Sequence, residues 1–267
     1  MDNFFEHTIG FNEYITGNRF IDICSDSGNE FCKTDFLRIH NTKKYKSFVT
    51  HNSDYHIDQQ RYLTGPKADR WYCQNKDVDH DNLISIPIGL ENMTLRSDNK
   101  RYAHHSSEVK NALIKANIID RYSGFHLSKN NLVYMNFNTN TYPIERKYVW
   151  NKFSKDPWIT KTSNLSMEKF YFDVASSKFI ISPRGNGVDC HRTWEALYLR
   201  AIPIVRRSTH MKEFEDLPIF FVDNWDKVCY NTLLEFYEKV KTKLFNLDKM
   251  KISYWRDKID DKLLEQF

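Results

Sequence analysis

One segment of the chain, residues 179–197, combines residue types that together could bind a phosphorylated ligand. It reads Phe-Ile-Ile-Ser-Pro-Arg-Gly-Asn-Gly-Val-Asp-Cys-His-Arg-Thr-Trp-Glu-Ala-Leu. Gly185 and Gly187 stand between an expected strand and an expected helix. Glycine there lets the backbone approach a ligand closely, and the N-terminus of the helix offers unpaired N–H groups to an anion. We therefore expect a phosphate group to bind at this loop.

Charged side chains of the same segment match the other parts of a nucleotide. Arg184 and Arg192 carry forked guanidinium donors that fit phosphate oxygens. Glu195 lies about one helical turn beyond Arg192, so both side chains project from one face, and a carboxylate accepts hydrogen bonds from ribose hydroxyls. The alternative interpretation is a surface ion pair beside a glycine turn. The order strand, loop, helix, strand favours the nucleotide site, for which the candidate residues are Arg184, Gly185, Asn186, Gly187, Asp189, Arg192 and Glu195.

The segment from Ser182 to Val205 resembles the C-terminal nucleotide-sugar segment of the exostosin-like glycosyltransferases, including the shorter ones of large DNA viruses. In that family a Pro-Arg-Gly loop precedes an arginine, an aromatic-Glu-Ala-Leu string and a Gly-x-Ile-Pro-Ile/Val-Val strand. A looser likeness extends back to Asn131. Arg200 stands where the family usually has glycine, so the fine donor specificity does not carry over at that position.

The resemblance implies an α/β protein of the GT-B fold, in which two Rossmann-like lobes face each other across a cleft. It implies an inverting transfer of a sugar from a nucleotide-diphosphate donor to a hydroxyl of an oligosaccharide or glycoprotein acceptor, with no obligatory metal or other cofactor. A UDP-sugar is the expected donor, and UDP-xylose is one specific hypothesis. The loop after the first strand of the second half should face the diphosphate, which adds Asn138 and Arg146 to the donor-binding residues. An exposed helix arginine is the alternative interpretation of Arg146.

An inverting transfer also needs a general base that takes the proton of the acceptor hydroxyl. In GT-B enzymes this base usually comes from the first lobe, where a polar cluster follows an expected strand at residues 46–50. The carboxyl ends of such strands hold the ligands of open α/β sheets. Asp54 is the first candidate for the base, His51 and His56 come next, and Asp58 follows. Their alternative role is that of solvated helix caps, and we expect no metal site among them.

Two other function hypotheses stay open. Asp77-Val78-Asp79 is a DxD string, which in GT-A glycosyltransferases binds the donor through a divalent ion. There the string follows an apolar strand, whereas here it follows polar residues 74–76, so we interpret it as a solvated loop or as part of the acceptor surface. The second hypothesis is a non-catalytic glycan-binding module, since aromatic residues make up 15% of the chain. A module of that kind needs no nucleotide site.

Composition narrows the class of protein. The chain has 267 residues, 8 glycines and a net charge of +4 that is spread along it. No GxGxxG or GxxxxGK[ST] string occurs, which argues against dinucleotide dehydrogenases and P-loop NTPases. The spread charge favours a small anionic ligand over a nucleic acid. An odd number of cysteines (5) without a CxxC pair, and the lack of an apolar leader or membrane span, predict a soluble cytoplasmic protein.

Short apolar runs alternate with helical patterns, which predicts two α/β halves. The expected strands are at residues 19–23, 46–50, 70–74, 83–88, 131–137, 178–182, 202–205 and 219–222. The expected helices are at 144–153, 166–176, 188–199, 225–245 and 252–264.

A polar stretch at residues 91–107 has the composition of a linker, and we place the domain boundary near it or shortly after. We predict an acceptor-binding lobe at residues 1–125 and a nucleotide-sugar-binding lobe at 126–250. The C-terminal helix, within 251–267, is expected to pack back on the first lobe.

Overall fold

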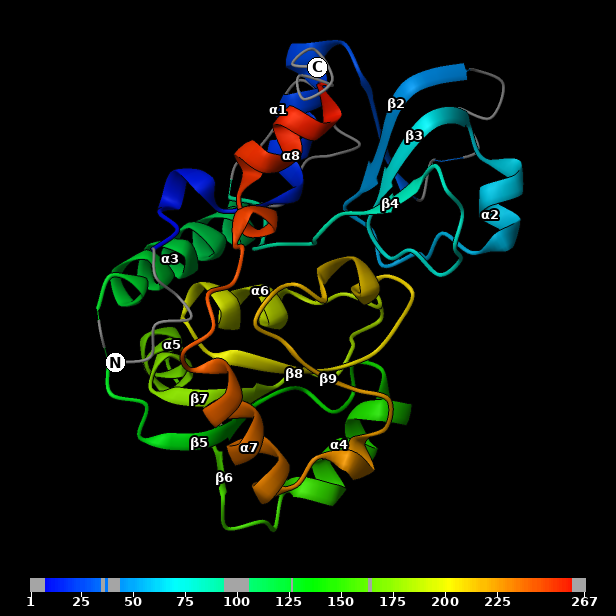
Figure 1. The fold of residues 1–267 in the computed structure, drawn as a ribbon. Coiled ribbons are helices and arrows are strands. Elements are labelled where there is room, and N and C mark those ends of the chain that lie inside the picture. The colour runs from blue at the N-terminus through cyan, green and yellow to red at the C-terminus, as the bar shows by residue number, and fades with distance from the viewer. Residues whose placement is uncertain are drawn as a thin grey trace.

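The computed structural model describes residues 8–34, 37, 44–93, 106–125, 127–162 and 165–260. Within these ranges the protein is an α/β structure with two parallel sheets, one above the other in Figure 1. The sequence therefore predicts the fold class correctly. Most of the stretch chosen as the boundary, residues 94–105, lies outside the described residues.

The first sheet has the strand order β1-β2-β3-β4, and all its neighbouring strands are parallel. The last five residues of β2 are buried, so the carboxyl end of this strand lies inside the protein. The short helix α2 connects β2 to β3. The elements are β1 (Glu30–Lys33), β2 (Lys44–His51), α2 (Gln59–Thr64), β3 (Lys67–Cys73) and β4 (Leu83–Ser85).

The prediction of a strand at residues 19–23 is wrong, because these residues belong to helix α1 (Gly17–Ser27). The side chain of Thr16 caps the helix by accepting a hydrogen bond from the backbone N–H of Arg19. Gly28 ends it with a left-handed φ of 73°. A short apolar run fits a strand and a buried helix equally well, and here the two caps decide for the helix.

The second sheet has the strand order β6-β5-β7-β8-β9, and all its pairs are parallel. Four of these strands confirm expected ones, whereas β6 was not expected. Figure 1 shows α5 and α6 on one face of the sheet and α4 and α7 on the other. The elements are β5 (Asn131–Met135), α4 (Pro143–Phe153), β6 (Ile159–Lys161), α5 (Met167–Ala175), β7 (Ser177–Ile181), α6 (His191–Tyr198), β8 (Ile202–Arg206), β9 (Phe220–Val222) and α7 (Tyr230–Val240).

Helix α6 ends in a left-handed turn at Arg200, whose φ is 59°. The N–H of Ala201 bonds the carbonyl of Ala196 at 2.9 Å, and the N–H of Arg200 bonds that of Leu197 at 3.0 Å. This is the Schellman arrangement, which favours glycine at the left-handed position. The preference explains physically why a glycine would suit the site that Arg200 occupies.

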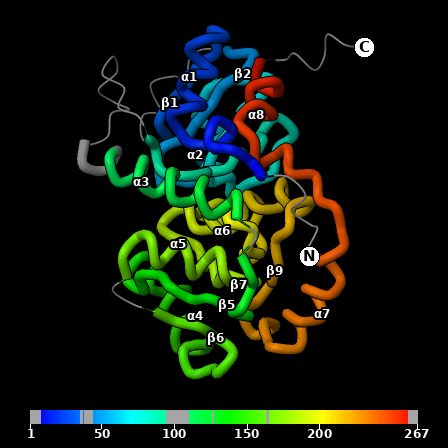
Figure 2. Tube along the Cα trace, turned by 90° about the vertical axis from the view of Figure 1, so that its left-hand side faces the viewer, coloured from blue at the N-terminus to red at the C-terminus, as the bar shows by residue number. Residues whose placement is uncertain are grey.

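Two helices connect the halves. Helix α3 (Ser106–Ser123), which the patterning did not predict, contacts α5 and α6. Helix α8 (Ile252–Ile259) follows the strands of both sheets in the sequence but lies beside α1 at the first sheet, as Figures 1 and 2 both show. The carbonyl of Lys258 accepts a hydrogen bond from Tyr72 at 2.7 Å, and that of Ile259 accepts one from Ser47 at 3.3 Å.

One hydrophobic core spans both sheets, since it contains Val49 and Tyr72 of the first and Val133 and Phe179 of the second. A smaller core, around Phe48 and Trp71, covers the opposite face of the first sheet. None of the helices in the described ranges combines the length and the apolar character that crossing a bilayer requires.

Candidate functional site

Two adjoining cavities lie between the sheets. In the second sheet the neighbours of β5 are β6 and β7, and the chain passes from one side to the other at this point. Open parallel sheets bind ligands at such a reversal, beyond the carboxyl ends of the strands. A cavity of about 650 Å³ opens there, which we call the arginine cavity; its lining includes Asn136, Thr141, Arg146, Tyr171, Gly185, Asn186, Gly187, Asp189, Arg192 and Glu195.

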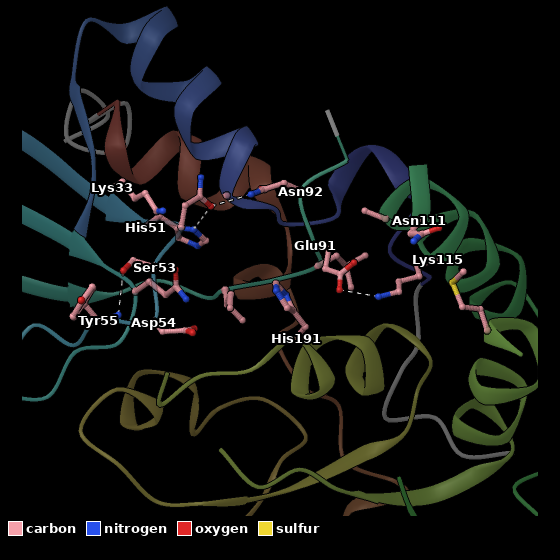
Figure 3. Close-up of a pocket in the computed structure, with 17 residues that line it drawn as sticks. Lys33, His51, Ser53, Asp54, Tyr55, Glu91, Asn92, Asn111, Lys115 and His191 are labelled. Carbon is pink, nitrogen blue, oxygen red and sulfur yellow. Dashed lines mark hydrogen bonds and ion pairs between the residues drawn. The ribbon is translucent and has the colours of Figure 1, made fainter. Parts of the chain in front are cut away.

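The second cavity, of about 910 Å³, lies at the carboxyl end of the first sheet. We call it the amide cavity, because four amide side chains contribute to its wall, Asn52, Gln74, Asn92 and Asn111. Figure 3 shows its lining. Six residues belong to the walls of both cavities and mark the junction between them: Asp54, Ile88, Glu91, Lys115, Met167 and His191.

Two guanidinium groups lie close together in the arginine cavity. Arg146 is only 5% exposed, and it donates to the backbone carbonyls of Arg184 at 2.9 Å and Asn138 at 3.1 Å. The Nε atom of Arg192 is buried without a hydrogen-bond partner in the described part of the chain. Burial lowers the pKa of Arg146, and the positive charge of Arg192 lowers it further. Two guanidinium groups this close together suit a bound anion.

A carboxylate faces the same cavity from helix α6. Glu195 accepts a hydrogen bond of 2.7 Å from the hydroxyl of Tyr171. Burial raises the pKa of this hydroxyl well above its usual value, and the negative charge of Glu195 raises it further. Tyr171 therefore stays protonated and holds one carboxylate oxygen in place.

The predicted Arg184 and Asn138 do not line the arginine cavity. The Arg184 guanidinium donates to the carbonyl of Asn186 and contacts the ring of His56, both at 2.9 Å. It therefore stabilises the loop between β7 and α6, to which it belongs. Asn138 lines a separate cavity of about 500 Å³ with Lys147 and Trp150, and only its carbonyl contacts Arg146. The structure brings the other seven predicted donor-binding residues together at one cavity.

Asp189 joins the two halves of the chain. Its buried carboxylate accepts hydrogen bonds from the backbone of Ile88 at 2.7 Å, from the Trp194 indole at 2.8 and 2.9 Å, and from the backbone of Cys190 at 2.8 Å. The ring of His210 lies 3.5 Å away. With its oxygens engaged in this way, Asp189 positions the loop between β7 and α6 against the end of the first sheet.

Gly187 allows the two halves to approach. A Cβ atom at this position would lie 2.8 Å from the amide of Asn75, which is too close for any other residue without a shift. Asn75 in turn accepts a hydrogen bond from the backbone of Asp189 at 3.1 Å and donates one to the carbonyl of Ser53 at 3.0 Å. The absence of a side chain at Gly187 therefore leaves room for the Asn75 amide where the halves meet.

Of the three residues predicted as the base, Asp54 and His51 line the amide cavity and His56 does not. Asp54 is exposed at the junction of the cavities and accepts a hydrogen bond of 3.3 Å from Asn186. His51 is buried beside the amide cavity, and burial lowers its pKa to about 4. His56 lines neither cavity; its Nε2 atom contacts Arg184, and its Nδ1 atom lies 3.5 Å from Asp77.

The other carboxylates of that region contact groups of the chain itself. Asp58 caps helix α2 by accepting a 2.8 Å hydrogen bond from the backbone N–H of Arg61. A helix cap is the alternative role that the sequence suggests for this residue. Asp79 pairs with Lys76 at 3.0 Å, and the hydrogen bond from that lysine lowers the pKa of Asp79. In the described ranges no group of three His, Cys, Asp or Glu side chains has a geometry that could hold a metal ion.

Three junction residues were missed as candidates. Glu91 accepts a 2.7 Å hydrogen bond from Lys115 (Figure 3). The Nδ1 atom of His191 lies 2.7 Å from the carbonyl of Gly89. Glu91 stands in the stretch interpreted as a linker, and Lys115 lies on the unexpected helix α3. His191 lies within residues 179–197, directly before Arg192. Its position next to a predicted donor-binding residue is the sequence signal that could have identified it.

A scan against models of protein families and a search of curated proteins both found no significant match to this sequence. The function is therefore inferred from the geometry of the two cavities and from the residue pattern of the segment between β7 and β8.

Proposed function

We propose that this protein is an inverting glycosyltransferase of the GT-B fold. It transfers a sugar from a nucleotide-diphosphate donor, preferably a UDP-sugar, to a hydroxyl of a glycan. The observation that carries the proposal is the pair Arg146 and Arg192, which lines a cavity at the strand reversal together with residues 185–187. Two parallel sheets with cavities between them suit this assignment.

Each part of the donor has a partner in the arginine cavity. The two guanidinium groups supply the positive charge that stabilises the departing diphosphate. Glu195, held by Tyr171, has a carboxylate that can accept hydrogen bonds from ribose hydroxyls. The amide cavity suits the acceptor, because amide groups both donate to and accept from sugar hydroxyls. The junction is then the place where the sugar is transferred.

Binding of UDP to the wild type and to Arg192→Ala tests the proposal. A hydrogen bond to a charged group contributes about 1.5–3 kcal/mol, so the variant should bind UDP roughly 10- to 150-fold more weakly. Isothermal titration calorimetry measures both affinities. Arg121→Ala is the matched control, since Arg121 forms an exposed ion pair with Glu168 and lines neither cavity. A wild type without UDP affinity, or equal affinities in Arg192→Ala and the wild type, would contradict the proposal.

A further inference from the structure

We propose that His191 is the general base of the transfer, acting through its Nε2 atom; this inference rests on the proposed function. His191 is the first residue of α6 and lines both cavities. The acceptor hydroxyl has to meet the sugar where the cavities join. A base for this hydroxyl must lie within hydrogen-bond reach of the same point.

The contacts of His191 fix which of its nitrogens can accept a proton. Its Nδ1 atom lies 2.7 Å from the backbone carbonyl of Gly89. A carbonyl oxygen only accepts, so Nδ1 carries the hydrogen, and in the neutral ring Nε2 keeps its lone pair. The carbonyl thus selects the tautomer and sets the orientation of the ring, as the partner of a catalytic histidine usually does.

His191 lies where the two proposed substrates would meet. Figure 3 shows its ring at the amide cavity, and the residue also lines the arginine cavity. The next residue, Arg192, faces the proposed diphosphate site, so one turn of α6 carries both the base and a group that stabilises the leaving group.

The other candidates have competing contacts. Glu91 is engaged in a 2.7 Å ion pair with Lys115. In His51 the Nε2 atom lies 3.0 Å from the carbonyl of Pro87, and Nδ1 faces the side chain of Asn52. His56 contacts Arg184 and lines neither cavity. The remaining rival is Asp54, which lies at the junction but is exposed to solvent.

In the proposed step, a lone pair of the acceptor oxygen forms a bond to the anomeric carbon of the sugar. The bond from that carbon to the diphosphate oxygen breaks, and its electron pair leaves with the nucleoside diphosphate. The proton of the acceptor hydroxyl passes to Nε2 of His191, and the resulting imidazolium later releases it to water. Water takes the place of the acceptor when no glycan is present.

His191→Asn tests the assignment. An asparagine amide can keep the hydrogen bond to the carbonyl of Gly89 but has no basic nitrogen. We expect release of UDP from UDP-glucose, UDP-galactose, UDP-N-acetylglucosamine or UDP-xylose to fall about 10²- to 10⁴-fold, the range of general-base catalysis. UDP affinity should stay within about threefold, and added imidazole should restore part of the rate. His80→Asn, a histidine outside both cavities, should match the wild type.

Two further measurements keep the outcomes separate. NMR of the protein labelled with ¹⁵N in its histidines should show His191 with its hydrogen on Nδ1 at neutral pH. The opposite tautomer overturns the assignment even where hydrolysis is too slow to follow. Near-normal turnover in His191→Asn, with a loss in Asp54→Asn, moves the base to Asp54. A wild type that neither binds UDP nor releases it overturns the proposed function itself, together with the base assignment.

Discussion

The two cavities share part of their walls but differ in the groups that line the rest. Arg146 and Arg192 line only the arginine cavity, where their positive charges repel each other. The four amide side chains and His51, which burial keeps neutral near pH 7, line only the amide cavity. A pair of guanidinium groups suits a phosphate, whereas amide groups suit a neutral ligand rich in hydroxyls. The difference predicts that mutations in the two cavities will have separable effects.

The largest expected effect is at Asp189, because it holds the walls of both cavities together. Asp189→Ala leaves buried N–H groups of Ile88, Cys190 and Trp194 without their acceptor. At about 1 kcal/mol or more for each, we expect the free energy of unfolding to fall by about 3 to 5 kcal/mol. Urea denaturation measures the change. Asp58→Ala, which removes an exposed helix cap, should cost only about 1 kcal/mol; equal losses in the two variants would refute the joining role of Asp189.

The second effect concerns the amide cavity and depends on pH. The folded state lowers the pKa of His51 from 6.5 to about 4, so the unfolded chain binds a proton first as the pH falls. This contribution to stability is complete above pH 6.5 and is lost as the pH falls from 6.5 toward 4. It should remove about 2 to 3 kcal/mol between pH 7 and pH 4.5.

Urea denaturation at the two pH values checks this in the wild type and in His51→Gln. The glutamine variant should lose less stability on acidification, since it lacks the titrating ring. His80→Gln, which replaces a histidine outside both cavities, should retain the acid sensitivity of the wild type. The same loss on acidification in all three proteins would show that His51 does not titrate as its burial predicts.

The smallest effect should be confined to the arginine cavity. Tyr171→Phe removes the hydrogen bond that holds one oxygen of Glu195, worth about 1 kcal/mol. UDP affinity should fall roughly three- to tenfold, while stability at acid pH changes as in the wild type. Calorimetry with UDP gives the affinity. Tyr148→Phe removes an exposed hydrogen bond to Asp226 and should not alter it; a Tyr171→Phe variant that binds UDP normally would remove Glu195 from the donor site.

Local and non-local features of the site differ in how far the sequence predicts them. Residues 185–195 form one loop and helix, so their spacing alone brings Arg192 and Glu195 to a common face. The ion pair between Glu91 and Lys115 depends on how α3 packs, so no local sequence pattern predicts it. The mistaken strand at residues 19–23 has a different, local cause, because caps at Thr16 and Gly28 outweigh a short apolar run.

The same limit applies to individual side chains. Asp189 stands among ligand-binding residue types, yet its partner at Ile88 lies on a distant part of the chain, so the sequence suggests a ligand contact where the structure shows a joint between halves. Arg184 likewise has the right chemistry for phosphate but donates to the carbonyl of Asn186. A residue's type limits what it can bind, and its tertiary partners determine what remains free to bind.

The position of α8 has a consequence for the order in which the protein can fold. The first sheet is synthesised early, but Ser47 and Tyr72 form hydrogen bonds with the carbonyls of Ile259 and Lys258. The ribosome makes these two residues after the strands of the second sheet, which end at Val222. Assembly of the first half is therefore completed only after the strands of the second half have been synthesised.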